Sequence, residues 1–178
     1  CDRRQRQMCI RDSDKIGAEF EKGTLFLPQL IMSAGVAQAA FEVIRKHMVM
    51  SDNAPVSKGK IVIATVKGDV HDIGKNIVKV LLENYGYDVI DLGKDVEYQA
   101  VVDAIRDNDV KLCGLSALMT TTLVSMKETI ALIRENNLDC KVMVGGAVLT
   151  PEYAKEIDAD FYAKDAKESV DIAKRVLG

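Results

Sequence analysis

Residues 60–76, KIVIATVKGDVHDIGKN, join an apolar run to an amphipathic run through a connection that carries Asp69, His71 and Asp72. The apolar run is typical of a buried strand, and the amphipathic run is typical of a helix. A phosphate-binding loop often occupies such a connection, but this one has too few glycines to surround a diphosphate. The stretch therefore predicts a strand–loop–helix unit whose loop presents a histidine between carboxylates.

The same alternation continues to the end of the sequence. Four more apolar, strand-like runs follow at 88–92, 111–118, 141–146 and 159–163. Amphipathic stretches lie near 74–85, 97–107, 122–136, 151–157 and 165–177. Five strands alternating with five helices predict an α/β fold, a flavodoxin/Rossmann-like five-stranded parallel sheet with helices on both faces. Ligands bind beyond the carboxyl ends of such strands, so the connections after strands one, three, four and five should converge.

Three segments precede the predicted α/β domain of residues 60–178. Residues 1–13, CDRRQRQMCIRDS, have no apolar period and resemble translated adapter sequence, so we expect a non-native tail; a genuine disordered tail is the alternative. Residues 14–50 carry an apolar stripe at alternating steps of four and three, which predicts a truncated helical-bundle cap. Residues 51–59 are polar with proline and glycine, and we interpret them as a linker.

The composition excludes several classes of protein. Apolar residues make up 48% and charged residues 29%, as in ordinary soluble globular domains. No apolar run approaches the roughly 20 residues that cross a bilayer, so we expect no membrane partner. A net charge of −3, without a basic stripe, argues against a nucleic-acid partner. The four cysteines form no CxxC pair and no zinc spacing, which favours a reducing, cytoplasmic setting.

His71 is the candidate metal ligand. A histidine that ligates a metal usually has its other ring nitrogen held by a carboxylate, and Asp69 is placed for that role. One histidine is not a zinc site, because catalytic zinc needs about three protein ligands. If His71 is a ligand, the metal must therefore arrive with most of its coordination filled, inside a cofactor.

Three short motifs occur in order along this alternation: D-x-H-x-x-G at Asp69, S-x-L at Ser116 and G-G at Gly145. Together they resemble the signature of cobalamin-binding domains that hold the corrinoid base-off and His-on. The resemblance implies that His71 is the axial cobalt ligand and Asp69 its hydrogen-bonded relay. It also implies that Thr122 stands where relatives carry a serine hydroxyl that touches the relay. The further cofactor-binding residues that it implies are Asp72, Ile73, Gly74, Ser116, Leu118, Thr120, Gly145 and Gly146.

Residues 17–44 resemble the helical cap that covers the methyl face of cobalamin in methyl-transfer proteins, with Phe26 and Val36 at positions that shield the upper axial ligand. This resemblance implies a corrinoid methyl carrier that accepts a methyl group on Co(I) from a substrate methyltransferase and passes it to a second, acceptor methyltransferase. The cofactor would be methylcobalamin, and a reductive activation protein would be a further partner. The chain would be the non-catalytic subunit of a methyltransferase system, as in methanogens and acetogens.

Two other functions stay open from the sequence. One is the cobalamin module of a methionine synthase, and the other is a cobalamin-dependent sensor or interaction module. A response-regulator receiver is disfavoured, because the third strand ends at Leu115-Ser116 where a receiver carries its phosphoacceptor aspartate.

Several other side chains receive ordinary structural interpretations. Met119, Met126 and Met143 are predicted to fill the core. Lys75 and Lys79 are interpreted as exposed helix lysines, with contact to the polar edge of the corrin as the alternative.

Overall fold

The fold is described from a computed structural model, and the described residues are 57–178 together with Lys15, Glu19, Lys22 and Met32. Apart from those four residues of the predicted cap, the predicted tail, the cap with Phe26 and Val36, and most of the predicted linker lie outside the described residues. Within the described part of the chain, no helix is long and apolar enough to cross a membrane.

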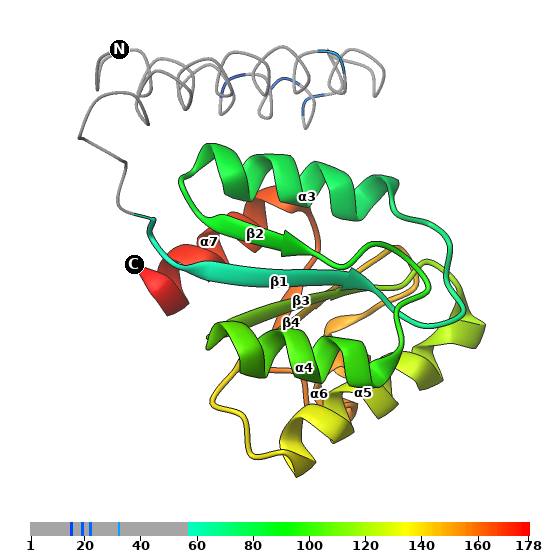
Figure 1. Ribbon diagram of the computed structural model, residues 1–178. Coiled ribbons are helices and arrows are strands. Elements are labelled where there is room, and N and C mark those ends of the chain that lie inside the picture. Colours follow the sequence, from blue (N-terminus) through cyan, green and yellow to red (C-terminus); the bar gives the residue numbers. More distant parts are fainter. Residues whose placement is uncertain (1–14, 16–18, 20–21, 23–31, 33–56) are drawn as a thin grey trace.

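The predicted five-stranded parallel sheet is confirmed, with the strand order β2-β1-β3-β4-β5 (Figure 1). The strands are β1 (Lys60–Thr65), β2 (Asp88–Asp91), β3 (Leu112–Ser116), β4 (Lys141–Gly145) and β5 (Phe161–Ala163). The helices are α3 (Ile73–Asn84), α4 (Tyr98–Asn108), α5 (Leu123–Glu135), α6 (Pro151–Glu156) and α7 (Ala166–Leu177), and a short 3-10 turn, η1 (Thr120–Thr122), precedes α5. The third strand ends two residues before its predicted end, because the chain turns away from the sheet after Ser116.

Helices cover both faces of the sheet, as the apolar strands predict. Figure 1 shows α3 and α7 on one face and α4, α5 and α6 on the other. Alternate residues of a strand point to opposite faces, so β1 contributes to two cores. Val62 and Ala64 pack with the α4–α6 side, whereas Ile61 and Ile63 pack with the α3 and α7 side. All four side chains are buried.

The carboxyl ends of four strands lie in register at one edge of the sheet, here called the carboxyl edge. Thr65 of β1 pairs with Ser116 of β3, Ser116 pairs with Gly145 of β4, and Gly145 pairs with Ala163 of β5. The connections that leave these strands therefore begin side by side, as the sequence predicts. The opposite edge, where the strands begin, is called the amino edge.

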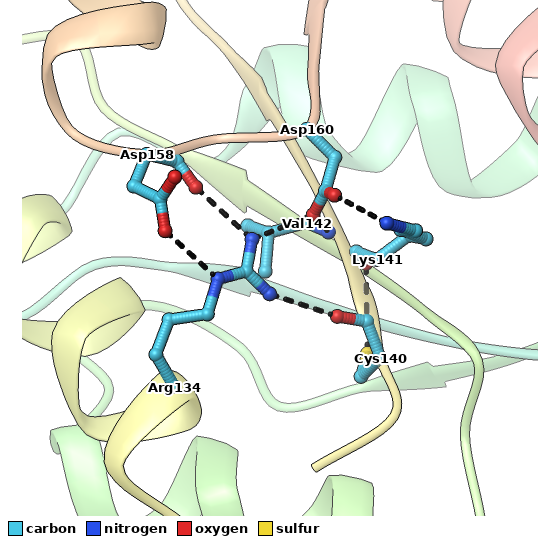
Figure 2. Close-up of polar contacts among 6 residues, drawn as sticks. All are labelled: Arg134, Cys140, Lys141, Val142, Asp158 and Asp160. Atoms are coloured by element: carbon cyan, nitrogen blue, oxygen red, sulfur yellow. Dashed lines mark hydrogen bonds and ion pairs between the residues drawn. The ribbon is translucent and has the colours of Figure 1, made fainter. Parts of the chain in front are cut away.

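A polar network ties the amino edge together around Asp160, the residue before β5 (Figure 2). The guanidinium of Arg134, in the last turn of α5, donates to the Asp160 carboxylate at 2.6 Å and to the Asp158 carboxylate at 3.2 Å. Lys141 donates to the other oxygen of Asp160 at 2.8 Å, and the amide of Val142 also donates to this carboxylate at 2.8 Å. These bonds link α5, β4 and the start of β5 on the side away from His71.

Candidate functional site

Asp69 is the centre of the carboxyl edge. It lies in the loop after β1, and no part of it is exposed to solvent. One carboxylate oxygen accepts hydrogen bonds from the backbone amide of His71 at 3.0 Å and from the ring Nδ1 of His71 at 2.8 Å. The other oxygen accepts from the amides of Leu118 and Met119 at 2.7 and 3.2 Å and from the Thr122 hydroxyl at 3.0 Å. One buried carboxylate therefore joins the loops after β1 and β3.

The donors around Asp69 keep its carboxylate ionised. Burial alone would raise the pKa of Asp69, but hydrogen bonds from the backbones of His71 and Leu118 and from the side chains of His71 and Thr122 outweigh it and hold the pKa well below its usual range. Among residues 57–178, no lysine or arginine forms an ion pair with Asp69; the only ion-pair partner is His71. The negative charge is thus stabilised by backbone and hydroxyl dipoles and is directed at one imidazole.

The ring of His71 is oriented by this contact. Because an ionised carboxylate only accepts hydrogen bonds, Nδ1 must carry a proton, and in the neutral ring the lone pair lies on Nε2. The side chain is 47% exposed, and none of the described residues hydrogen-bonds to Nε2. The arrangement presents one basic ring nitrogen to whatever binds above the carboxyl edge.

Thr122 binds the carboxylate oxygen of Asp69 that does not contact His71. It is buried, and its hydroxyl donates to Asp69 at 3.0 Å and also lies 2.8 Å from the carbonyl oxygen of Met119. The hydrogen bond to Asp69 is the one that the sequence resemblance implies for a serine. The extra methyl group of threonine lies 3.5 Å from the position that a Cβ at Gly68 would take, which is ordinary contact. Threonine therefore fits this position.

Gly145 and Gly146 bring the strand ends together. A Cβ on Gly146 would lie 1.8 Å from the carbonyl oxygen of Ala117, and the φ of Gly146 is +139°. A Cβ on Gly145 would lie 3.1 Å from the carbonyl oxygen of Ala163. The missing side chains thus let Gly146 approach the loop after β3 and let Gly145 approach the end of β5. Leu118, which follows Ala117 in that loop, donates its amide to Asp69. This packing role was not predicted from the sequence, where only passage of a ligand was considered.

Gly74 differs from the paired glycines. It is the second residue of α3, and a Cβ there would meet no atom within 4 Å. No contact within the described chain requires glycine at this point, although glycine destabilises a helix relative to alanine by roughly 0.5–1 kcal/mol. The open space lies three residues beyond His71.

Exposed apolar side chains lie on the loops and helix starts of the carboxyl edge, where His71 also lies. The exposed large apolar residues of 57–178 are Val70, Ile73, Leu118, Met119 and Val124, and all of them lie on the loops after β1 and β3 or at the starts of α3 and α5. The prediction that Met119 fills the core is wrong, because its amide is drawn to Asp69 and its side chain is 38% exposed. Met126 and Met143 are buried, as predicted.

The remaining predicted site residues take varied positions. Asp72 precedes α3 without a side-chain capping bond, and Ser116 ends β3, where its carbonyl accepts from Val66 at 3.1 Å. Thr120 is exposed in η1. These three residues lie at the carboxyl edge, but none of their side chains joins the Asp69 network.

The donor set suits a metal that brings its own ligands. In the described part of the chain, no group of three or more His, Cys, Asp or Glu side chains could hold a metal ion. One imidazole nitrogen, an apolar rim and an open space at Gly74 instead fit a large, flat metal complex. The residues present therefore fit a corrinoid better than a protein-held metal ion.

Comparison with known proteins agrees with this geometry. A B12-binding domain family matches residues 59–171, and a second B12-binding domain family matches residues 13–45. Dimethylamine corrinoid protein 1 of Methanosarcina acetivorans is 42% identical over 166 residues, covering 92% of this chain and 78% of the relative. Dimethylamine corrinoid protein 3 of Methanosarcina mazei is 41% identical over 166 residues, covering 92% of this chain and 99% of the relative.

Solved structures give the same picture. A cobalamin-binding protein from Desulfitobacterium hafniense superposes with a TM-score of 0.82 at 33% identity, covering 99% of this chain and 85% of the other. The methanol:cobalamin methyltransferase complex of Methanosarcina barkeri superposes with a TM-score of 0.81 at 31% identity, covering 95% of this chain and 64% of the other. A response regulator from Staphylococcus aureus, at 19% identity and a TM-score of 0.51, shares the fold alone. The chain therefore belongs to the family of B12-binding corrinoid proteins, and its cofactor is a corrinoid.

Proposed function

We propose that the protein is a methyl carrier that holds its corrinoid base-off, with Nε2 of His71 as the lower axial ligand of cobalt. The observation that carries the proposal is the 2.8 Å contact between Nδ1 of His71 and the fully buried carboxylate of Asp69. A carboxylate on the far ring nitrogen fixes the tautomer and raises the basicity of the ligating nitrogen. The His71 side chain is 47% exposed, so it offers Nε2 as a donor atom at the carboxyl edge.

The protein's own part in this function is positioning. The corrinoid supplies the cobalt centre that takes up and gives off a methyl group, and the chain supplies orientation and electrostatic tuning. Asp69 holds the proton on Nδ1, while Thr122 and the amides of Leu118 and Met119 hold Asp69. Because these donors are neutral amides and a hydroxyl, the position of the Asp69 carboxylate does not depend on a lysine or arginine side chain.

The surface around His71 supports a base-off arrangement. The apolar rim of Val70, Ile73 and Leu118 offers contact to the macrocycle, and the open space at Gly74 admits a bulky group beside α3. The remaining cofactor contacts belong to the proposal alone: the nucleotide tail beside Asp72, Ser116, Thr120, Gly145 and Gly146, and the upper face against Phe26 and Val36.

The relatives indicate the class of partner. One solved relative is described as a methanol:cobalamin methyltransferase complex, and the sequence relatives are dimethylamine corrinoid proteins. We infer that this chain works with a methyltransferase that takes methyl groups from methylated amines or methanol. The second, acceptor methyltransferase and a reductive activation protein are further parts of the proposal.

The visible spectrum of protein reconstituted with hydroxocobalamin tests the ligand. The wild type should show the change that follows replacement of the cofactor's own base by a histidine, and His71→Ala should lose that change. The chain has two histidines, so His47→Ala is a matched control that should behave as the wild type. A His71→Ala spectrum identical to that of the wild type would overturn the proposal.

A further inference from the structure

The turn after β2 contacts the His71 loop at its first residues. The carboxylate of Asp95 accepts a hydrogen bond from the amide of Gly68 at 2.7 Å, and the amide of Asp95 donates to the carbonyl of Asp69 at 3.0 Å. Asp69 is fully buried, so its carbonyl needs a partner within the protein. Asp95 therefore holds the backbone of the relay residue, whereas the loop after β3 holds its side chain.

The geometry of this contact depends on the residue type at position 95. Asp95 has a φ of +54°, in the left-handed region, where aspartate and asparagine are tolerated far better than alanine. The turn is also hydrogen-bonded to the end of β1. The amide of Thr65 donates to the carbonyl of Gly93 at 3.0 Å, and the amide of Val96 donates to the carbonyl of Thr65 at 3.2 Å. Gly68 itself has a φ of +84°. Two left-handed residues thus face each other across one short hydrogen bond.

The same segment holds the other end of the His71 loop. Lys75, in the first turn of α3, is only 4% exposed, and its Nζ lies 2.5 Å from the carboxylate of Asp91 at the end of β2. Asp91 also accepts from Lys79 at 3.3 Å and from the amide of Gly93 at 2.9 Å. The interpretation of Lys75 as an exposed helix lysine is wrong, because the lysine is folded back onto Asp91.

We propose that residues 91–95, the end of β2 and the turn after it, form a brace that positions the imidazole of His71. Asp95 is its principal positioning residue at one end, and Asp91, paired with Lys75, is the other end. His71 lies between the two attachment points, Gly68–Asp69 on one side and Lys75 on the other. Loss of the brace lets the backbone of Asp69 shift, so the 2.8 Å contact to Nδ1 loosens. The consequence for corrinoid binding rests on the proposed function; the consequence for the imidazole does not.

Three substitutions at one position separate the two contributions of Asp95. Asp95→Asn keeps both the acceptor and the tolerance of positive φ, Asp95→Gly keeps only the tolerance, and Asp95→Ala keeps neither. The nitrogen NMR signals of the His71 ring in cofactor-free protein report which ring nitrogen carries the proton. We expect a single Nδ1–H tautomer in the wild type and in Asp95→Asn, a partial mixture in Asp95→Gly, and the largest mixture in Asp95→Ala. Lys75→Met should also produce a mixture.

A matched control excludes a general loss of stability. Asp109 has a φ of +49° at the amino edge, so Asp109→Ala imposes the same backbone strain far from His71. It should lower the unfolding midpoint without altering the ring signals. If Asp95→Ala does not fold, the comparison of Asp95→Gly with Asp95→Asn carries the test. Ring signals of Asp95→Gly identical to those of the wild type would overturn the brace.

Hydroxocobalamin titration completes the test. Removal of groups that orient a metal ligand typically weakens binding by 10–100-fold, so we expect about a tenfold loss in Asp95→Ala and recovery in Asp95→Asn. If His71→Ala changes the cobalamin spectrum but folded Asp95→Ala keeps the wild-type affinity, the brace is overturned. If the ring signals respond to Asp95 but His71→Ala leaves the cobalamin spectrum unchanged, the brace stands and the proposed function fails.

Discussion

Two aspartates, one at each edge of the sheet, are each held by several hydrogen bonds, but the donors differ in kind. At the amino edge, Asp160 binds the cations Arg134 and Lys141 together with one backbone amide (Figure 2). At the carboxyl edge, Asp69 binds backbone amides, a hydroxyl and an imidazole, and no lysine or arginine of residues 57–178 pairs with it.

The difference gives the two carboxylates different electrostatic surroundings. Burial would raise the pKa of Asp160, but hydrogen bonds from Lys141, Val142 and Arg134 outweigh it and lower the pKa. The charge of Asp160 is neutralised by the cations Arg134 and Lys141. The pKa of Asp69 is lowered without a permanent cation nearby, so its charge remains available to polarise His71. Both carboxylates thus have several hydrogen-bond donors and a lowered pKa, but only Asp160 is paired with lysine and arginine among residues 57–178.

The largest expected effect comes from Gly146→Ala, which tests whether the carboxyl edge depends on backbone approach. The added Cβ would lie 1.8 Å from the carbonyl of Ala117, at a φ of +139°. Backbone must move, so we expect destabilisation of more than about 4 kcal/mol, which is exceptional for one substitution. Urea denaturation of cofactor-free protein measures it. Near wild-type stability would show that Asp69 does not need this packing.

The next largest effect is expected for Asp160→Ala, which removes the hydrogen bonds of Asp160 at the amino edge and leaves the carboxyl edge unchanged. The substitution removes one carboxylate partner from Arg134 and Lys141 and the acceptor of the Val142 amide, so it should lower the free energy of unfolding by about 2–4 kcal/mol. The hydroxocobalamin spectrum of the folded fraction should not change. The matched control is Asp139→Ala, an exposed partner of Lys111 at the same edge, which should change stability by no more than about 1 kcal/mol. A cobalamin spectrum that changes with Asp160 would contradict the separation of the two networks.

The third prediction concerns how the contribution of Asp69 to stability depends on pH. Its folded pKa lies below the ordinary value of 3.8, so its contribution to stability is fully present above that value and is lost as the pH falls below it. Asp69→Asn should cost about 1–3 kcal/mol near neutral pH, because an amide cannot accept every hydrogen bond that the carboxylate accepts. Denaturant unfolding at about pH 6 and at about pH 3 should show this difference shrinking by up to about 1.4 kcal/mol per pH unit below 3.8. A difference that stays constant would contradict the lowered pKa.

The smallest effect is expected at Gly74, the counterpart of Gly146. A Cβ there meets nothing within 4 Å, so Gly74→Ala should stabilise the cofactor-free protein by roughly 0.5–1 kcal/mol. The same substitution should weaken hydroxocobalamin binding if a bulky group approaches α3 at this point. Stability comes from chemical denaturation and affinity from absorbance titration. Unchanged affinity would mean that the space at Gly74 has no part in binding.

The sequence predicts the architecture well because its signals are local. Apolar runs that alternate with amphipathic ones predict a parallel sheet, and the observed element bounds differ by only a few residues. Strand ends of a parallel sheet share one edge, so the sequence also predicts that Asp69, His71 and Thr122 lie together, and they are joined by hydrogen bonds. The resemblance, rather than periodicity, supplies the chemistry of the site.

The features that the sequence does not predict all depend on contacts between distant segments. Asp95 and Asp91 look like ordinary turn and strand-end carboxylates until the fold brings them to Gly68 and Lys75. The tie at Asp160 likewise joins residues from different elements, with nothing in the local pattern to mark it. One usable signal does exist: aspartate two residues after Gly93 suggests a left-handed turn residue.

Electron paramagnetic resonance of the Co(II) form tests the proposed binding of Nε2 of His71 to the lower face of cobalt. Protein produced with nitrogen-15 histidine and reconstituted with unlabelled cobalamin would be compared with unlabelled protein. If His71 is the axial ligand, the splitting from the axial nitrogen changes from the triplet of nitrogen-14 to the doublet of nitrogen-15. A triplet that persists in the labelled protein would show that the cofactor's own base still occupies the metal, and would contradict the account.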